Sequence, residues 1–544
     1  MGFVDGKASG VMCSYNLING VPNCASPALL NGKIRSEWGR EDALVVSDCG
    51  VLGFTMGSPT NWDPETAVSN TFNAGMDLDT GNKGKDNFVF ADVVPRAIAS
   101  GKLNVSTIDT ALSRAIMVRM TAGAFDPVEG QQYTKIPAET VNASSHWAAN
   151  LDAASQGLVL LRNLGASTGS PAALPLRAGG KLAVVGPHAV SQHGLFSDYY
   201  GDQVCFDGTP NGFGRNFSCV PTIGTMLSRH NTGGETRVEP GVDMKSFRAS
   251  GIATALAAVE WADTIVLALG TDVIDVEHEG MDRENVGLPS GLQTSFAIGV
   301  LSIAKKRGVP VVMLLCNGGA VSIDNLLTND QPSAVIESFF PGHRGAEAIA
   351  RHVFGLDNRF GKLPYDIMST ATAASYSIVD YSMHNRTYRY LPYSPEAISF
   401  RFGYGLSFTS FSMTMKSVEK FAAGQGSGTA RRQTTTSYTL ALSNVGSRSG
   451  DAVVTAYFRP DAATAAKAGP SSALLQRQLF DFGRIALGPG RSADVTFEAS
   501  AEVLRLVNEN GERVAVRGVY TLFFSLGQQL AQGSTDELSV TITV

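Results

Sequence analysis

The chain has 544 residues, of which 44% are hydrophobic and 17% are charged. This length suits about three domains with large buried cores, and the composition excludes a disordered tail. Lys and Arg number 43 against 49 Asp and Glu, and the formal net charge of -6 argues against a nucleic-acid binder, which usually has a basic excess. No apolar run is long enough for a membrane span, and the first residues lack the basic and apolar regions of a signal peptide.

The six cysteines do not have the spacing of a metal site. Neither a CxxC pair nor a Cys/His cluster occurs, so we expect no zinc or other metal. Two cysteine pairs close short glycine-containing loops, which predicts two disulfides, with six reduced thiols as the alternative. The pairs are Cys13 with Cys24 and Cys205 with Cys219, and we expect Cys49 and Cys316 to be buried thiols.

The first region, residues 1–121, alternates short apolar strands with helical patterns. It contains only about three β/α units, fewer than a closed barrel needs. Gly39 is predicted to stop the first helix, because glycine readily takes the left-handed conformation at a helix end. We predict strands at 11–15 and 43–46, helices at 28–38, from Asp63, at 92–99 and at 106–120, and a further strand at 75–79.

Residues 122–150 resemble a polar linker, and residues 151–410 form a second β/α region. Repeated strand and crossover-helix patterns indicate a doubly wound parallel sheet. We predict strands at 182–186, 264–270, 309–316 and 334–340, and helices at 153–162, 251–260, 292–306 and 345–354.

The third region, residues 430–544, follows a Gly/Ser-rich break at 422–428. Its hydrophobic pattern has a period of two, and turn signals separate the apolar runs. This is typical of a small β-sandwich of the immunoglobulin or fibronectin type III kind. The predicted strands are 436–444, 452–458, 493–497, 513–516 and 520–525.

Asp48 follows the apolar strand 43–46. A carboxylate at the carboxyl end of a parallel strand lies on the side where α/β barrels place catalytic groups. The alternative is that Asp48 caps the next helix, a position that aspartate favours. Asp77 and Asp79 end the strand predicted at 75–79, and for them we favour structural caps or loop anchors.

The loop 271–283 contains five carboxylates within eleven residues. Such a loop is usually solvated surface, but like charges can raise the pKa of one carboxyl and suit it to general acid catalysis. A retaining glycosidase needs a pair of carboxylates about 5–5.5 Å apart, one as nucleophile and one as acid/base. His278 lies between Glu277 and Glu279, and we expect it to be a modulator or a surface residue rather than a base.

Together these motifs resemble glycoside hydrolase family 3, in its β-xylosidase/α-L-arabinofuranosidase branch. The resemblance runs over essentially the whole chain, and its strongest part is the segment 10–39 followed by VVSDCG at 45–50. The other matching motifs are AGMDLD at 74–79, LVLLRN at 158–163, EHEGMDR at 277–283, GKLP at 361–364, FGYGLSFTSF at 402–411 and LFDFGRIALGPG at 479–490.

The resemblance implies a fold and a set of site residues. The fold is the C-terminal part of a (β/α)8 barrel, then an α/β sandwich domain, then a fibronectin type III-like domain. Asp48 takes the place of the family's nucleophile, and Glu279 that of its acid/base, with Glu277 as the alternative. Tyr15 and Met12 take the place of substrate-binding residues.

The resemblance also implies a function. We expect a retaining exo-glycosidase, most specifically a xylan 1,4-β-xylosidase acting on xylan or arabinoxylan. The alternatives are a β-glucosidase of the same family and an inactive, truncated glycan-binding remnant, because the family's first β/α units are expected to be missing. We expect no cofactor, nucleic acid or membrane partner. An extracellular location is expected, with glycosylation sequons at Asn104, Asn142, Asn216 and Asn385.

Overall fold

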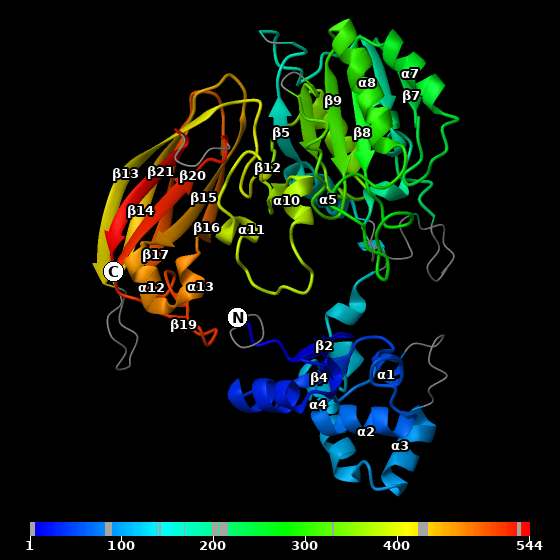
Figure 1. Ribbon diagram of the computed structural model, residues 1–544, viewed down its shortest axis with the longest axis vertical. Helices are drawn as coiled ribbons and strands as arrows, with labels where there is room; N and C mark the ends of the chain where they lie inside the picture. The colour runs from blue at the N-terminus through cyan, green and yellow to red at the C-terminus, as the bar shows by residue number, and fades with distance from the viewer. Residues whose placement is uncertain are drawn as a thin grey trace. The chain divides into compact units, whose positions relative to one another are not determined.

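The computed structural model divides the chain into two compact units, Met1–Thr140 and Val141–Val544. Figure 1 draws the chain coloured from one end to the other. Among the described residues, no helix is both long and apolar enough to cross a membrane. The predicted break at 422–428 and the sequon at Asn142 lie outside the described residues, apart from Ala422. The structure describes residues 6–81, 90–137, 139–140, 143–167, 169–197, 205, 216–328, 331–422, 434–529 and 535–544.

The first unit is built on a short parallel sheet. Strand β1 (Gly10–Cys13) pairs in parallel with β4 (Leu44–Ser47), close to the two predicted strands. The strand predicted at 75–79 is reduced to one pairing, between Leu78 and Val46. The reason is that the Asp77 carboxylate accepts the Val45 N–H at 2.8 Å, which removes a backbone donor that a third strand would use.

Two helix boundaries of the first unit lie where the sequence predicts them. Asp63 caps α2 (Pro64–Ala74), because its Oδ1 accepts the Thr66 N–H at 3.0 Å. Gly39 has a φ of 63° and follows Trp38, the C-cap of the first helix, which confirms the predicted stop. The first helix is η2 (Ala28–Glu37). Further helices are α1 (Val51–Met56), α3 (Phe90–Ala99) and α4 (Val105–Thr121), and β2 (Leu17–Ile18) and β3 (Val21–Pro22) form a small hairpin.

The second unit contains a six-stranded sheet in the order β5-β10-β9-β8-β6-β7. Five of the strands run in parallel, as predicted, and β5 is antiparallel to β10. The strands are β5 (Val159–Asn163), β6 (Lys181–Val185), β7 (Glu235–Glu239), β8 (Thr264–Gly270), β9 (Val311–Cys316) and β10 (Ala334–Glu337).

Helices cover both faces of this sheet, because alternate strand residues are buried on opposite sides. One face packs against α7 (Ile252–Trp261) and α8 (Gln293–Arg307), through residues such as Leu267 and Leu315. The other packs against α5 (Ser144–Gly157), α6 (Ile223–His230) and α9 (Gly345–Val353). Figure 1 shows the green strands of this sheet with α7 and α8 beside them.

Two predictions near the start of this unit were wrong. Residues 158–162 are not the end of a helix, since α5 stops at Gly157 and β5 begins at Val159. The helix also starts at Ser144, inside the predicted linker 122–150. The apolar run Leu158–Leu161 fits either a helix or a buried strand, and it became an edge strand because β10 offered a backbone partner.

The last part of the second unit is a β-sandwich, as predicted. One sheet has the order β13-β14-β17 and the other the order β16-β15-β20-β21. Aromatic side chains such as Tyr438, Phe458 and Phe524 fill the space between them. The strands are β13 (Phe411–Ala422), β14 (Thr434–Asn444), β15 (Gly450–Pro460), β16 (Gln478–Leu487), β17 (Ser492–Ser500), β20 (Val519–Ser525) and β21 (Glu537–Thr543).

Lys362 connects the α/β sheet domain to this sandwich. Its ammonium group is fully buried and donates to the carbonyl oxygens of Gly405 and Leu526, each at 2.6 Å. Burial lowers the pKa of Lys362 to about 7, although nearby Asp536 acts in the opposite direction.

Candidate active site

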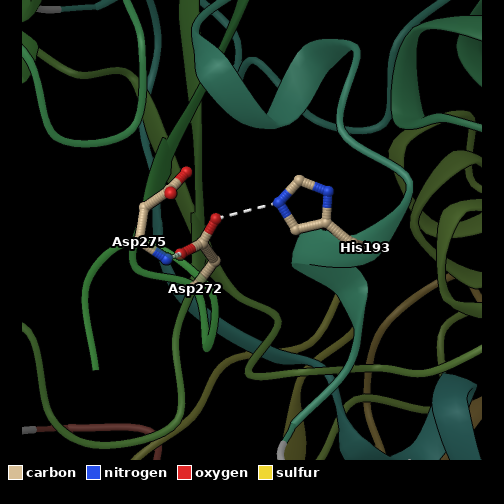
Figure 2. Close-up of side chains that lie close together, drawn as sticks. All are labelled: His193, Asp272 and Asp275. Carbon is tan, nitrogen blue, oxygen red and sulfur yellow. Dashed lines mark hydrogen bonds and ion pairs between the residues drawn. The ribbon is translucent and has the colours of Figure 1, made fainter. Parts of the chain in front are cut away.

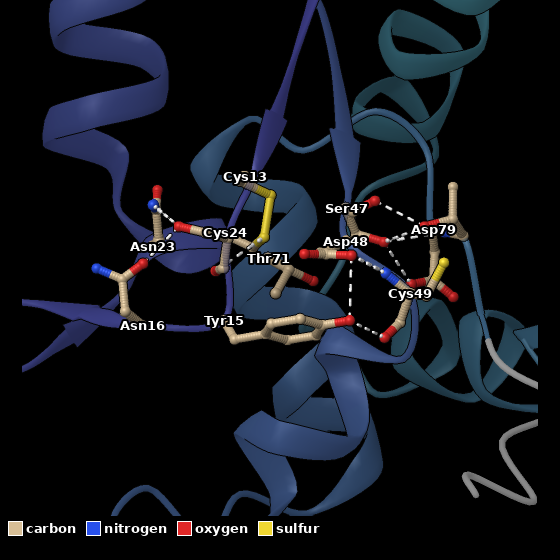
Figure 3. Close-up of a disulfide and its surroundings, with 12 residues drawn as sticks. Cys13, Tyr15, Asn16, Asn23, Cys24, Ser47, Asp48, Cys49, Thr71 and Asp79 are labelled. Atoms are coloured by element: carbon tan, nitrogen blue, oxygen red, sulfur yellow. Dashed lines mark hydrogen bonds between the residues drawn. A yellow bond between two sulfur atoms is a disulfide. The ribbon is translucent and has the colours of Figure 1, made fainter. Parts of the chain in front are cut away.

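Asp48 lies directly after β4, at the carboxyl end of the parallel pair. Its Oδ1 accepts hydrogen bonds from the Cys49 N–H at 2.7 Å and from the Tyr15 hydroxyl at 3.1 Å. Among the described residues, no hydrogen bond reaches Oδ2. Figure 3 shows the carboxylate above the Tyr15 ring, with dashed lines to the Tyr15 hydroxyl and to the Cys49 nitrogen. One oxygen is therefore held in place while the other remains available to react.

Tyr15 is held on both sides. Its ring packs against Phe54, with ring centroids 4.7 Å apart, and its hydroxyl also lies 2.7 Å from the Cys49 carbonyl oxygen. The structure therefore brings two of the predicted site residues, Tyr15 and Asp48, into contact. Met12 lies on β1 with 60% of its surface exposed, and no hydrogen bond or ring contact joins it to Asp48 among the described residues.

The segment before Tyr15 is held by the predicted disulfide between Cys13 and Cys24 (Figure 3). The second predicted disulfide, Cys205 with Cys219, is also present. The prediction that both remaining thiols are buried was wrong for Cys49, which is exposed. Cys49 lies just past the end of β4, after Asp48, whereas Cys316 lies inside a sheet covered on both faces.

Asp77 is an anchor, as expected, and not part of an open site. It is buried and forms ion pairs with Arg35 at 2.7 Å and Arg114 at 2.9 Å. Burial raises the pKa of the Asp77 carboxyl, although the Val45 N–H and both arginines act against this. Asp79 accepts a hydrogen bond from the Ser47 hydroxyl at 3.0 Å, so it ties the end of β4 to the next segment.

The acidic loop after β8 forms a tight turn that carries Glu279. His278 and Met281 exchange two backbone hydrogen bonds, at 3.1 and 2.8 Å. Gly280 has a φ of 83°, a conformation that glycine takes without steric cost, so the sequence Glu279-Gly280 suits the two central positions of this turn. Glu279 is exposed at the tip of the turn.

Glu277 is bound by its own neighbours. Its two carboxylate oxygens lie 2.6 Å from the Thr271 hydroxyl and 2.5 Å from Arg283 Nε. Both oxygens of this carboxylate are therefore engaged by residues of the same loop. Glu277 is therefore placed to hold Arg283 and the base of the turn.

A pocket of about 530 Å³ opens beside this loop. Its polar lining includes Glu277, His278 and Arg283 from the loop, and Asn317 from the end of β9. Phe339 and Phe340 supply an aromatic wall, as in many small-molecule pockets, where apolar and aromatic side chains surround a few polar groups. Sequence reasoning missed Asn317 and the two phenylalanines as site residues, because they follow other strands, more than 30 residues beyond the acidic loop. His278, expected to be a modulator or a surface residue, is half-buried in this lining.

A second cluster at this edge of the sheet contains His193, Asp272 and Asp275 (Figure 2). The ligand atoms of these three residues lie within 4.8 Å of one another, and His193 Nε2 lies 3.0 Å from Asp272 Oδ2. Asp272 Oδ1 accepts the N–H groups of Ile274 and Asp275. Burial acts to raise the pKa of Asp272, but His193 and the Asp275 N–H outweigh it and hold that pKa below its usual value. The contacts of Asp272 with His193 and with the two N–H groups thus hold the start of the acidic loop.

Three family models match the chain. The Glycosyl hydrolase family 3 N terminal domain matches residues 2–118, and the Glycosyl hydrolase family 3 C-terminal domain matches residues 158–408. The Fibronectin type III-like domain matches residues 452–525. The chain therefore belongs to glycoside hydrolase family 3, with a fibronectin type III-like domain after the two family domains.

Curated relatives are similar over most of the chain. A probable exo-1,4-beta-xylosidase of Aspergillus clavatus is 28% identical over 96% of this chain, which spans 65% of that relative. Beta-D-xylosidase 1 of Arabidopsis thaliana is 31% identical over 76% of this chain and 49% of its own length. This chain thus spans just under two thirds of the first relative.

Solved structures share the fold. The GH3 exo-beta-xylosidase XlnD, in complex with a xylobiose aziridine activity based probe, has a TM-score of 0.80 and 26% identity, covering 99% of this chain and 67% of that one. A beta-glucosidase from Listeria innocua, in complex with isofagomine, has a TM-score of 0.77 and 22% identity, covering 99% and 69%. The predicted fold class is confirmed.

Proposed function

We propose that the protein is a retaining exo-glycosidase that releases β-linked xylose, with Asp48 as the nucleophile and Glu279 as the acid/base. The observation that carries the proposal is the Asp48 carboxylate, whose Oδ1 is fixed by Tyr15 and the Cys49 N–H while no hydrogen bond from a described residue reaches Oδ2. The names of the relatives point to xylosides. A xylan or arabinoxylan chain is the proposed substrate.

The proposed reaction has two displacements. In the first, Asp48 Oδ2 bonds to the anomeric carbon, the glycosidic C–O bond breaks, and Glu279 gives its proton to the leaving oxygen. In the second, the Glu279 carboxylate takes a proton from water, the water oxygen bonds to the anomeric carbon, and the bond to Asp48 breaks. Tyr15 stabilises the leaving carboxylate by hydrogen bonding to Oδ1.

Glu279 is proposed over Glu277 for the acid because of what each one contacts. Glu277 is paired with Arg283 at 2.5 Å and bonded to the Thr271 hydroxyl at 2.6 Å, so both of its oxygens are already in contact with the protein. Glu279 is exposed at the tip of the turn, where a substrate can approach it. An extracellular location is also proposed, because two disulfides are typical of proteins that fold in oxidising compartments.

The test is turnover of aryl β-D-xyloside, α-L-arabinoside and β-D-glucoside by the full chain, by Asp48→Asn and by Asp109→Asn. Asp109 is an exposed aspartate on α4 and serves as the matched control. We expect xyloside hydrolysis with retained configuration, its loss by several orders of magnitude in Asp48→Asn, and no change in Asp109→Asn. Faster glucoside turnover would favour a β-glucosidase. Xylobiose binding without turnover would favour a glycan-binding remnant.

A further inference from the structure

Glu337 is a fully buried carboxyl group that the proposed glycosidase reaction does not use. It ends β10, and Asn317, also fully buried, follows the neighbouring parallel strand β9. Glu337 pairs with Leu315 in the sheet register. The pairing continues past the strand ends, because the Asn317 N–H donates to the Phe339 carbonyl at 3.2 Å.

The two side chains share one face of the sheet. Val335 and Leu315 belong to the core under α7 and α8, and alternation along each strand places Glu337 and Asn317 on that same side. Phe339 and Tyr365 are partly buried against the same core, with ring centroids 6.0 Å apart. Glu337 and Asn317 are therefore neighbours at the edge of the sheet from which the acidic loop leaves.

Their polar atoms are left incompletely paired. Glu337 Oε1 accepts the Phe339 N–H at 3.2 Å, and Asn317 Nδ2 donates to the Gly319 carbonyl at 2.6 Å. Among the described residues, Glu337 Oε2 and Asn317 Oδ1 have no hydrogen-bond partner. Two unpaired buried acceptors are costly, and a proton on Oε2 would turn one of them into a donor.

The backbone next to Glu337 is arranged around this carboxyl. Phe339 has a φ of 53°, in the left-handed region that a bulky residue adopts only at a cost in free energy. In this conformation its N–H reaches Glu337 Oε1. The contact therefore compensates for local strain, and both Phe339 and Asn317 form part of the pocket lining.

We infer that Glu337 is held as a neutral carboxylic acid that donates its proton to Asn317 Oδ1, and that this bond fixes the pocket wall beside Glu277 and Arg283. Glu337 is thus a positioning residue and does not touch a ligand itself. Its neutral state does not depend on the proposed hydrolase activity.

The charges around Glu337 support the neutral state. Burial raises its pKa to about 8, with the Phe339 N–H and Asn317 acting against this. Burial also raises the pKa of Cys316 to about 12 and that of Tyr365 above its usual value, so neither is charged at neutral pH. Arg283 pairs with Glu277 at 2.5 Å, and among the described residues no ion pair joins Glu337 to a cation.

The test is the pH dependence of thermal unfolding of the full chain and of Glu337→Gln. Glutamine keeps the shape and can donate to Asn317, but it does not titrate. For the wild type, the stabilising contribution of a carboxyl with a raised pKa is fully present below the usual value of 4.5 and is lost as pH rises through about 8. We therefore expect the melting temperature of the wild type to fall by several degrees relative to that of Glu337→Gln as pH rises from 4.5 to about 8.

Glu260→Gln is the matched control, because Glu260 is an exposed acid on α7. Its melting temperature should follow the wild type at every pH. A melting difference between Glu337→Gln and wild type that does not change with pH would overturn the inference.

Infrared spectroscopy of the wild type gives a second measurement that does not need a stable variant. A protonated carboxylic acid shows a carbonyl stretch that a carboxylate lacks. We expect this band at neutral pH, with loss above a pH of about 8. Absence of the band at neutral pH would show that Glu337 is ionised and that the assignment is wrong.

Discussion

Glu277 and Arg283 form an ion pair of 2.5 Å across the turn whose tip carries Glu279. Arg283 also donates to the Ala320 carbonyl at 3.1 Å, which joins this turn to the segment after β9. The two glutamates of one short motif therefore have different environments. One is committed to a structural contact, and the other is exposed.

This difference predicts opposite effects of two substitutions. Glu279→Ala should slow xylobiose far more than an activated aryl xyloside, because only the poor leaving group needs a proton. Added azide should restore turnover and give a β-configured azide product. Glu277→Ala should slow both substrates together by loosening Arg283. If Glu277→Ala shows the selective loss instead, the acid is Glu277.

Tyr15→Phe tests the contact with Asp48. The substitution removes only the hydroxyl, which lies 3.1 Å from Asp48 Oδ1, and keeps the ring that packs on Phe54. A hydrogen bond to a charged group contributes about 1.5–3 kcal/mol, so we expect turnover of the aryl xyloside to fall about ten- to a hundred-fold. Phe54→Leu is the comparison, with a smaller expected effect. Equal rates for Tyr15→Phe and wild type would remove the hydroxyl from the mechanism.

Thiol labelling should separate the six cysteines into three classes. In native protein one thiol, Cys49, should react with iodoacetamide, because Cys316 is buried and both other pairs are disulfides. Unfolding without reductant should make Cys316 reactive as well. Reduction of the two disulfides should then make the remaining four cysteines reactive. Non-reducing peptide maps should join Cys13 to Cys24 and Cys205 to Cys219. Labelling of Cys316 before Cys49 would contradict the burial described here.

Asp77→Asn should destabilise the first unit. The change leaves Arg35 buried beside Arg114 without the carboxylate that pairs with both. Removing one partner of a buried ion pair costs about 3–5 kcal/mol. Calorimetry should show this loss for Asp77→Asn and almost none for Asp42→Asn, whose pair with Arg40 leaves the carboxylate largely exposed. Similar melting temperatures for the two variants would show that Asp77 is not an anchor.

Lys362→Met should change the pH dependence of stability on the alkaline side. Burial lowers the pKa of Lys362 to about 7 from 10.5, so between these values the unfolded chain binds more protons than the folded one. Wild-type stability should therefore rise with pH across this window relative to Lys362→Met. The variant should also be less stable throughout, by about 1–3 kcal/mol, because buried carbonyl groups lose their donor. A constant difference at all pH values would mean that Lys362 keeps its charge.

The local elements could be predicted from the sequence because their signals are local. Asp63 and Gly39 mark helix ends, and the strand 264–270 matches β8 residue for residue. The alternation of period two in the last region was enough to identify a sandwich. The two disulfides were predictable since each closes a short loop. These features depend on contacts between residues that are near in the chain.

Contacts between distant parts of the chain determined the strands and side-chain environments that local sequence patterns could not predict. Residues 158–162 became a strand because β10 supplied a backbone partner, and 75–79 lost its strand because Asp77 took the Val45 N–H. Only the folded structure shows how Glu277 and Glu279 differ. Arg283 and Thr271 bind Glu277, whereas Glu279 is exposed. The buried pair of Glu337 and Asn317 is set by the register of two strands about 20 residues apart. Motif spacing therefore determined the family and its candidate residues, while burial and long-range pairing decided which of those residues are held and which are exposed.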